Sequence, residues 1–452
     1  MEAIVDWLNE NRQRVLSWFQ DDVFRRLFVN AGKLLSANVV AAVLGFATTI
    51  LTARALGPEN YGVLALVLVY QLTIGKLVTF NAWQAIIKFG SEALQAGDRA
   101  ALRQLIKFGF SLDIGSAVLG TILAVALSGP VIKLLGWDVS VCPLIMLYSI
   151  LILFSLSGTP IGILRLFDRF DLLSYTAVLS ASLRLAGVLW CLLSDQDLFG
   201  FVLVYLLTGI AGQLYQTVAA ISVMRHEGVG SILREPLSGI RSRFEGIWDY
   251  VWTTNLNATV RMLSREVDQL IIAGLTTPSA LGLFRVAKQF SLVLPRVTDP
   301  LYQAIYPELA HLWARGRKRA CLSLIKRTTL IVGAMGILGW IVFAVSGRWL
   351  IAATVGRPYL QAYPVALVYL LALVIAVFAF SLQPSMLAMG LPRNSFKAHL
   401  SATVLYLILL VPAVQYMGIT GAALASIVYY VVWSGLMVSY LWPNFRSEGQ
   451  RC

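Results

Sequence analysis

Residues 53–62 read Ala-Arg-Ala-Leu-Gly-Pro-Glu-Asn-Tyr-Gly and directly follow the first long apolar run of the chain. Residues 276–282, Thr-Thr-Pro-Ser-Ala-Leu-Gly, stand in the same place after a later apolar run. The two Pro-x-x-x-Gly turns begin at Pro58 and Pro278, which are 220 residues apart. Because a shared turn at the same place in two apolar arrays is hard to obtain by chance, the sequence predicts that the chain is built from two similar halves.

The composition is that of a membrane protein. Of the 452 residues, 58% are hydrophobic and 13% are charged, whereas soluble domains are about 45–50% apolar and about 25% charged. A helix needs about 20 apolar residues to cross the hydrocarbon core. The sequence therefore predicts an all-α polytopic membrane protein with about twelve transmembrane helices, in two six-helix pseudo-symmetric bundles around a central cavity. The predicted spans are 34–55, 61–87, 108–128, 141–164, 172–194, 199–223, 250–275, 280–306, 328–346, 360–388, 396–416 and 419–442.

The spans and the charged segments between them divide the chain. Six spans per half is an even number, so both halves share one orientation and are related by an axis along the membrane normal. We expect a cytoplasmic interfacial amphipathic helix at 1–30, an N-terminal half at 31–224, a cytoplasmic linker at 225–247, a C-terminal half at 248–443 and a cytoplasmic tail at 444–452.

The formal net charge of +13 comes mostly from short loops on one side of the predicted array. The positive-inside rule places both termini in the cytoplasm and the turns at 57–60 and 276–280 outside. Membrane orientation explains this charge, so no nucleic-acid partner is expected. The acidic residue at position 2 argues against a cleavable signal peptide. The four cysteines have no metal-binding spacing, and no phosphate-loop motif is present, so no metal, other cofactor or nucleotide hydrolysis is expected.

Charged residues inside the seventh and eighth spans are the main functional signal. Each costs about 2.5–3.5 kcal/mol at the bilayer centre, so such residues face protein or water. Spacings of three and four place the charges of each span on one helical face. The bases in or near the core are Lys76, Arg184, Arg261, Arg265, Arg285, Lys288 and Arg296, and the acids of the two spans are Glu266, Asp268 and Asp299.

Two interpretations of this set remain open. The bases outnumber the acids, so the set predicts a cationic, water-filled cavity that binds an anion, because guanidinium groups bind phosphate oxygens bidentately. The alternative is a group of structural ion pairs, since Asp268 and Asp299 each lie three residues after an arginine. Asp113, in the third span, is either a proton or cation coupling site, or a residue that caps a helix or pairs with a basic neighbour. Asp268 and Asp299 are the other candidate ion-coupling residues.

Several segments resemble one known family. Residues 53–62 resemble the segment after the first span of polysaccharide-transport (Wzx-type) flippases, which belong to the multidrug/oligosaccharidyl-lipid/polysaccharide exporter superfamily. Ser-Gly-Thr-Pro at 157–160 and Leu-Arg-Leu-Phe-Asp-Arg-Phe-Asp at 164–171 resemble the end of its fourth span. Val-Asp-Gln-Leu at 267–270 and Gly-Leu-Phe-Arg-Val-Ala at 282–287 resemble its seventh and eighth spans. Together these segments cover nearly the whole chain.

The resemblance implies a bacterial inner-membrane transporter that moves undecaprenyl-pyrophosphate-linked oligosaccharides by alternating access. Glycosyltransferases and a polysaccharide polymerase would be its partners in surface polysaccharide biosynthesis. Arg261, Arg265, Arg285 and Arg296 would hold the pyrophosphate or acidic sugars. Two alternatives stay open. One is a cation-coupled multidrug antiporter of the same superfamily, which the excess of bases disfavours, and the other is a membrane glycosyltransferase or polymerase, which the short outer loops disfavour.

Overall fold

The computed structural model describes residues 22–80, 82–156, 158–292, 301, 305–306 and 308–446. Side chains are described from residue 37 onward, except at 257–258, 260–265 and 446. Within this part of the chain every regular element is helical, which confirms the predicted fold class. The N-terminal half contains α2 (Asp22–Val78), α3 (Trp83–Gln95), α4 (Arg99–Leu135), η1 (Val139–Val141), α5 (Cys142–Phe154), α6 (Gly158–Leu166), α7 (Phe170–Leu193) and α8 (Leu198–His226).

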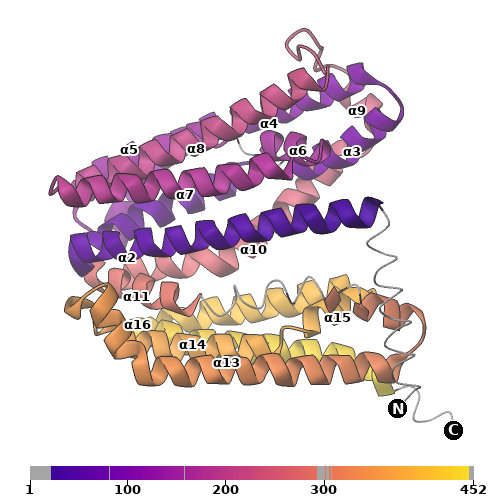
Figure 1. Ribbon diagram of the computed structural model, residues 1–452. Helices are drawn as coiled ribbons and strands as arrows, with labels where there is room; N and C mark the ends of the chain where they lie inside the picture. Colours follow the sequence, from indigo (N-terminus) through magenta and orange to yellow (C-terminus); the bar gives the residue numbers. More distant parts are fainter. Residues whose placement is uncertain are drawn as a thin grey trace.

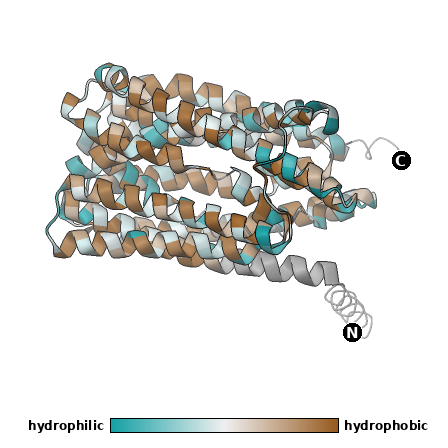
Figure 2. Ribbon diagram, turned by 90° about the horizontal axis from the view of Figure 1, so that it is seen from above, coloured by the Kyte–Doolittle hydropathy of each residue, from teal (hydrophilic) through white to brown (hydrophobic). Residues whose placement is uncertain are grey.

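The C-terminal half repeats this order after a short linker helix, α9 (Ile240–Arg243). It contains α10 (Ile247–Leu275), α11 (Pro278–Ser291), α13 (Lys318–Thr354), η2 (Arg357–Tyr359), α14 (Ala362–Phe378), α15 (Leu382–Ala388) and α16 (Pro392–Arg446). The two halves lie one above the other in Figure 1, with α2, α10 and α11 between them. Hydrophobic residues dominate the middle of the helices, and hydrophilic residues gather toward the two ends of the bundle (Figure 2).

Eight helices of the described chain are long and apolar enough to span a membrane. Two of them, Ala37–Val78 and Pro392–Phe445, are 42 and 54 residues long and each contain two spans. The backbone leaves helical geometry between those spans, at Gly57 and at Gly418. Both glycines have positive φ, which a residue with a Cβ adopts poorly. The more polar α10 and α11 occupy the seventh and eighth spans, so the predicted twelve-helix arrangement is confirmed.

Three predicted spans are interrupted, which the hydrophobicity pattern alone does not indicate. The span at 141–164 is divided between α5 and α6, and the span at 360–388 between α14 and α15. Proline has no N–H and its ring crowds the carbonyl four residues earlier. Four residues before Pro160 and Pro384 lie Leu156 and Phe380, and both fall inside the breaks.

The second span, predicted at 61–87, also breaks, between Val78 and Trp83. Here the backbone N–H of Phe80 donates to Ser116 Oγ of α4, at 3.4 Å, in place of a helical bond. At the N-terminus, α2 runs without interruption from Asp22 into the first span, so residues 22–30 belong to that helix. The rest of the predicted interfacial helix, residues 1–21, lies outside the described residues.

Buried residues form one core shared by the two halves and separate cores elsewhere. The shared core includes Leu66 and Ile132 of the N-terminal half and Leu281 and Tyr359 of the C-terminal half. It lies at the end of the bundle that carries the turns after the first and seventh spans, called here the turn end. At the opposite end, where the linker lies, one core joins the N-terminal half to the linker and the start of α10, and two further cores lie within the C-terminal half. The halves are therefore joined mainly at the turn end.

The linker is bound to the N-terminal half. Gln104 Nε2 of α4 donates to the carbonyl oxygens of Pro236 and Ser238, at 3.1 and 2.9 Å. Arg243 Nη2 pairs with Asp98 Oδ2 at 2.7 Å. The pKa of the Asp98 carboxyl is held below its usual value, first by the backbone N–H of Ala101 and then by Arg243. This end of α4 and the linker therefore form one unit.

Candidate functional site

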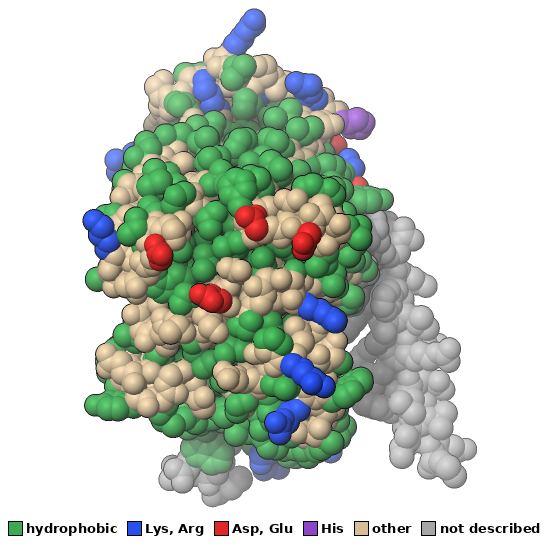
Figure 3. Space-filling view, turned by 90° about the vertical axis from the view of Figure 1, so that its left-hand side faces the viewer, with side chains coloured by type: hydrophobic (Ala, Val, Ile, Leu, Met, Phe, Trp, Pro, Cys, Tyr) green, Lys and Arg blue, Asp and Glu red, His purple; other side chains and the backbone are tan. Residues whose placement is uncertain are grey.

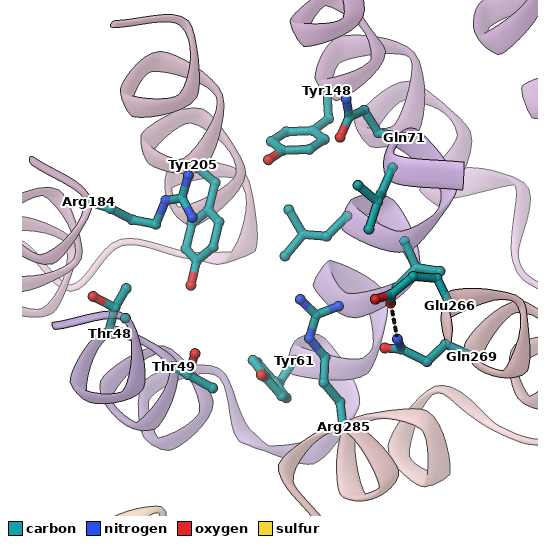
Figure 4. A pocket seen from close by; sticks show the side chains of 14 residues that line it. Thr48, Thr49, Tyr61, Gln71, Tyr148, Arg184, Tyr205, Glu266, Gln269 and Arg285 are labelled. Atoms are coloured by element: carbon teal, nitrogen blue, oxygen red, sulfur yellow. Dashed lines mark hydrogen bonds between the residues drawn. The ribbon is translucent and has the colours of Figure 1, made fainter. Parts of the chain in front are cut away.

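A cavity of ≈ 270 Å³ lies between the two halves (Figure 4). Both halves contribute to its wall, although the N-terminal half contributes most of it. Charged, aromatic and amide side chains face the space together, which is unusual for the interior of a membrane protein. The residues that line it are Gly45, Thr48, Thr49, Tyr61, Leu68, Val69, Gln71, Leu72, Tyr148, Arg184, Tyr205, Glu266, Gln269 and Arg285.

Arg285 enters the cavity from α11. Its guanidinium points into the middle of the cavity, toward the space between Tyr61 and Glu266 (Figure 4). Its Nη1 donates to the backbone carbonyl oxygen of Ala65, at 3.2 Å. Ala65 is 220 residues earlier and is therefore the repeat partner of Arg285. Two repeat-related residues can touch only close to the axis that relates the halves, so Arg285 lies on the central axis of the molecule.

Arg184 enters from α7, on the opposite wall. Its guanidinium carbon lies 5.1 Å from the ring centroid of Tyr205, a cation–π contact. Its Nε is buried and has no hydrogen-bond partner among the described residues. Buried donors are nearly always paired, so this donor is an exception among the described residues.

Tyrosine and amide side chains complete the polar surface. Tyr61, Tyr148 and Tyr205 present ring faces and hydroxyl groups, and the Tyr205 hydroxyl is 3.1 Å from Thr52 Oγ1. Glu266 accepts a hydrogen bond from Gln269 Nε2 at 2.9 Å. In the part of the chain that the structure describes, the cavity thus contains two bases and one acid, together with groups that hydrogen-bond hydroxyls. This combination suits an anionic ligand with a polyhydroxylated part.

Other predicted binding residues lie elsewhere. Lys288 Nζ contacts both carboxylate oxygens of Asp268, at 2.9 and 3.2 Å, and the two side chains are 11% and 4% exposed. This pair joins α11 to α10 instead of lining the cavity. Lys76 is exposed at the end of α2 and does not line the cavity either. The side chains of Arg261 and Arg265, and the whole of Arg296 and Asp299, lie outside the described residues.

Asp113 lies in the interior of the N-terminal half, fully buried. Its Oδ2 accepts from the backbone N–H of Thr159 at 2.7 Å, so it caps the first turn of α6. Its Oδ1 and the Thr159 hydroxyl are both buried, and neither has a partner in the described chain. Asp113 thus stabilises the break in the fourth span through one carboxylate oxygen, and its other carboxylate oxygen accepts no hydrogen bond from the described residues.

The tyrosine and glutamine residues of the cavity were not predicted from the sequence. Gln71, Tyr148 and Tyr205 are polar groups in strongly apolar spans, and that contrast was the available signal. Their direction around each helix depends on how the six helices of a half pack, which hydrophobicity alone does not determine. Glu266 was recognised as an acid of the seventh span, but it was not predicted to line the binding cavity.

Comparisons with known proteins agree with this architecture. A family model described as "Polysaccharide biosynthesis protein" matches residues 27–313. The "Inner membrane protein YghQ" of Escherichia coli (strain K12) is 30% identical over 350 residues, which are 76% of this chain and 97% of that protein. An inward-facing multidrug resistance MATE family transporter of the MOP superfamily is similar in structure, with a TM-score of 0.72 and 13% identity over 91% of this chain and 96% of the other. Lipid II flippase MurJ in an inward closed conformation is also similar in structure, with a TM-score of 0.70 and 15% identity over 90% of this chain and 87% of the other.

Proposed function

Because the chain belongs to the polysaccharide biosynthesis protein family, the Wzx-type branch of the MOP exporter superfamily, we propose that it is a flippase for undecaprenyl-pyrophosphate-linked oligosaccharides. It moves them across the inner membrane by alternating access, for the biosynthesis of O-antigen, capsule or exopolysaccharide. Glycosyltransferases supply the substrate on the cytoplasmic side, and a polymerase consumes it on the other side.

The observation that carries this proposal is the pair of guanidinium groups that face one cavity between the halves, Arg184 and Arg285. A pyrophosphate presents oxygens that two guanidinium groups can bind bidentately. The low polarity of the surrounding spans strengthens that attraction relative to water. The tyrosine rings and amide groups beside the arginines suit the sugar that follows the phosphate.

The same cavity disfavours the alternative of a cation-coupled multidrug antiporter. Among its described lining residues, two bases exceed the single acid, Glu266, which is itself hydrogen-bonded to Gln269. A cationic drug would be repelled by this surface. The membrane glycosyltransferase or polymerase alternative needs a catalytic surface, and the described residues that line the cavity do not include a pair of acids.

Transport needs an energy source, which we propose is an ion gradient or the removal of the product by polymerisation. Asp113 is the favoured coupling residue, since one carboxylate oxygen is buried and unused. Asp268 forms an ion pair with Lys288. For Asp268 to couple ion binding to transport, this ion pair would have to separate. Asp299 stays a sequence-based candidate.

Export assays on arginine variants test the proposal. Replacing Arg285 or Arg184 by Ala removes a charge-assisted hydrogen-bond donor, so we expect export to fall about ten- to hundredfold. Replacement by Lys keeps the charge but loses the bidentate fork, and should restore part of the activity. Surface glycan is measured in a deletion strain complemented with each variant, with membrane abundance quantified alongside. Arg265→Ala and Arg296→Ala extend the series to the other predicted bases.

Arg348→Ala is the matched control, because Arg348 is exposed and does not line the cavity. We expect it to export normally. Normal export by both Arg285→Ala and Arg184→Ala, at normal membrane abundance, would refute the assignment of the cavity as the substrate site.

A further inference from the structure

The turns after the first and seventh spans touch each other reciprocally. A Cβ added to Gly62 would lie 1.7 Å from the carbonyl oxygen of Pro278, and one added to Gly282 would lie 2.2 Å from that of Pro58. Neither glycine has positive φ, so their backbone conformation does not demand glycine. Glycine is required at both positions because the two helices approach each other closely there, as in small-residue helix crossings within membranes.

Two aromatic residues reach across the same interface. Trp137 Nε1 of the N-terminal half donates to the carbonyl oxygen of Ala273, at 2.6 Å. The Tyr359 hydroxyl of the C-terminal half donates to the carbonyl oxygen of Ala53, at 2.8 Å. Each acceptor lies in the last turn before its helix ends or kinks, where carbonyl groups lack a helical partner. The other half of the molecule therefore completes the hydrogen bonding of each helix end.

These contacts obey the internal symmetry of the chain. Ala53 and Ala273 are 220 residues apart, as are Pro58 and Pro278, and the two aromatic donors follow the third and ninth spans. Contacts related in this way surround the axis at the turn end. Ala53, Ala273 and Tyr359 are almost fully buried and belong to the core that the halves share. In the view of this end, the described residues of the halves meet without a visible opening (Figure 3).

We propose that the Gly62–Pro278 and Gly282–Pro58 crossings, with the Trp137 and Tyr359 hydrogen bonds, are the gate that closes the cavity toward the turn end. This deepens the proposed transport function and rests on it. The two crossings share one axis, so separating either requires moving both. The gate is therefore all-or-none, and a side chain at either glycine holds it open. Loss of either aromatic donor weakens it and leaves the helices intact.

Labelling of the cavity tests the gate without any substrate. The four cysteines are replaced, and Thr49, which lines the cavity, is changed to Cys. A membrane-impermeant maleimide is then applied to vesicles of known orientation, from each side separately. We expect Gly62→Ala and Gly282→Ala to raise the labelling rate from the turn-end side at least fivefold and to lower it from the linker side. Tyr359→Phe and Trp137→Phe should raise the turn-end rate about two- to threefold.

Matched controls separate gating from general loosening. Gly435→Ala adds a methyl group where no atom lies within 4 Å, and Tyr175→Phe removes a hydroxyl from a ring that is 64% exposed. Neither should change labelling from either side. Tyr359→Phe keeps the ring, so it remains informative if the glycine variants fail to insert. An unchanged turn-end rate in inserted Tyr359→Phe and Trp137→Phe overturns the gate, whereas altered labelling with unaltered glycan export would count against the proposed function alone.

Discussion

Arg285 and Lys288 lie one turn apart on α11, yet they have different environments. The guanidinium faces the cavity, while the ammonium group lies against Asp268 of α10. Residues three positions apart are separated by slightly less than one full helical turn, so their side chains point in different directions. At a crowded helix interface this difference is enough to place one side chain in the cavity and the other in an ion pair between helices. Charge inside a span is therefore not by itself evidence of substrate contact.

We predict that Lys288→Met destabilises the protein more than a surface change does. It leaves the carboxylate of Asp268, which is 4% exposed, without its lysine partner. Removing one partner of a buried pair costs about 3–5 kcal/mol, because the remaining charge is uncompensated. The thermal midpoint of the purified protein in detergent should fall accordingly.

The double variant Lys288→Met with Asp268→Asn is the informative comparison. It removes both charges, so we expect much of the lost thermal stability to return. If the double variant is as unstable as the sum of the two single variants, the pair does not interact energetically as the geometry indicates.

At the scale of elements, the broken spans are the main departure from the expected pattern. Both proline-associated breaks could have been derived from the sequence, since the carbonyl four residues before Pro160 or Pro384 loses its donor. The break after Val78 could not, because it depends on Ser116 of another helix. The positions of the spans, the repeat and the two equivalent turns were predictable from hydrophobicity and spacing. The partners of Arg184, Arg285 and Lys288 were not, because they depend on the rotation of each helix in the bundle.

We predict that Asp113 has two separable roles at the break in the fourth span. Asp113→Asn keeps an oxygen that can accept from the Thr159 N–H, so membrane abundance should be normal. It removes the titratable oxygen, so glycan export should be strongly reduced. Asp113→Ala also loses the cap, which is worth about 0.5–2 kcal/mol, and should lower abundance as well. Wild-type export by the Asn variant would leave Asp113 with its capping role alone.

At the scale of the whole molecule, the shared core at the turn end and the separate cores at the linker end correspond to one state of the alternating-access cycle that we propose. The internal symmetry relates the halves to each other, but at the linker end the core of the N-terminal half reaches the start of α10, and two further cores lie within the C-terminal half. The described conformation is accordingly closed at the turn end. The proposed cycle requires the shared core to separate there.

We predict that the turn end faces the outside of the cell and both termini face the cytoplasm. The excess of basic residues in the opposite loops is the reason. In a cysteine-free background, Glu59→Cys and Ser279→Cys should react with an impermeant maleimide in intact cells that have a permeabilised outer membrane. Ser242→Cys, exposed in the linker, should react only after the inner membrane is disrupted. Labelling of both turns from the inside alone would reverse the orientation.

The docked linker has a consequence for how the protein is made. Val229, Ile240 and Phe244 of the linker, and Ile247 and Val251 at the start of α10, belong to the linker-end core of the N-terminal half. A nascent chain that has emerged only as far as residue 224 has six spans but lacks these five side chains. The first half therefore completes its core only when the second half has begun to emerge from the ribosome. A fragment intended to fold as the isolated first half should accordingly extend to about residue 252.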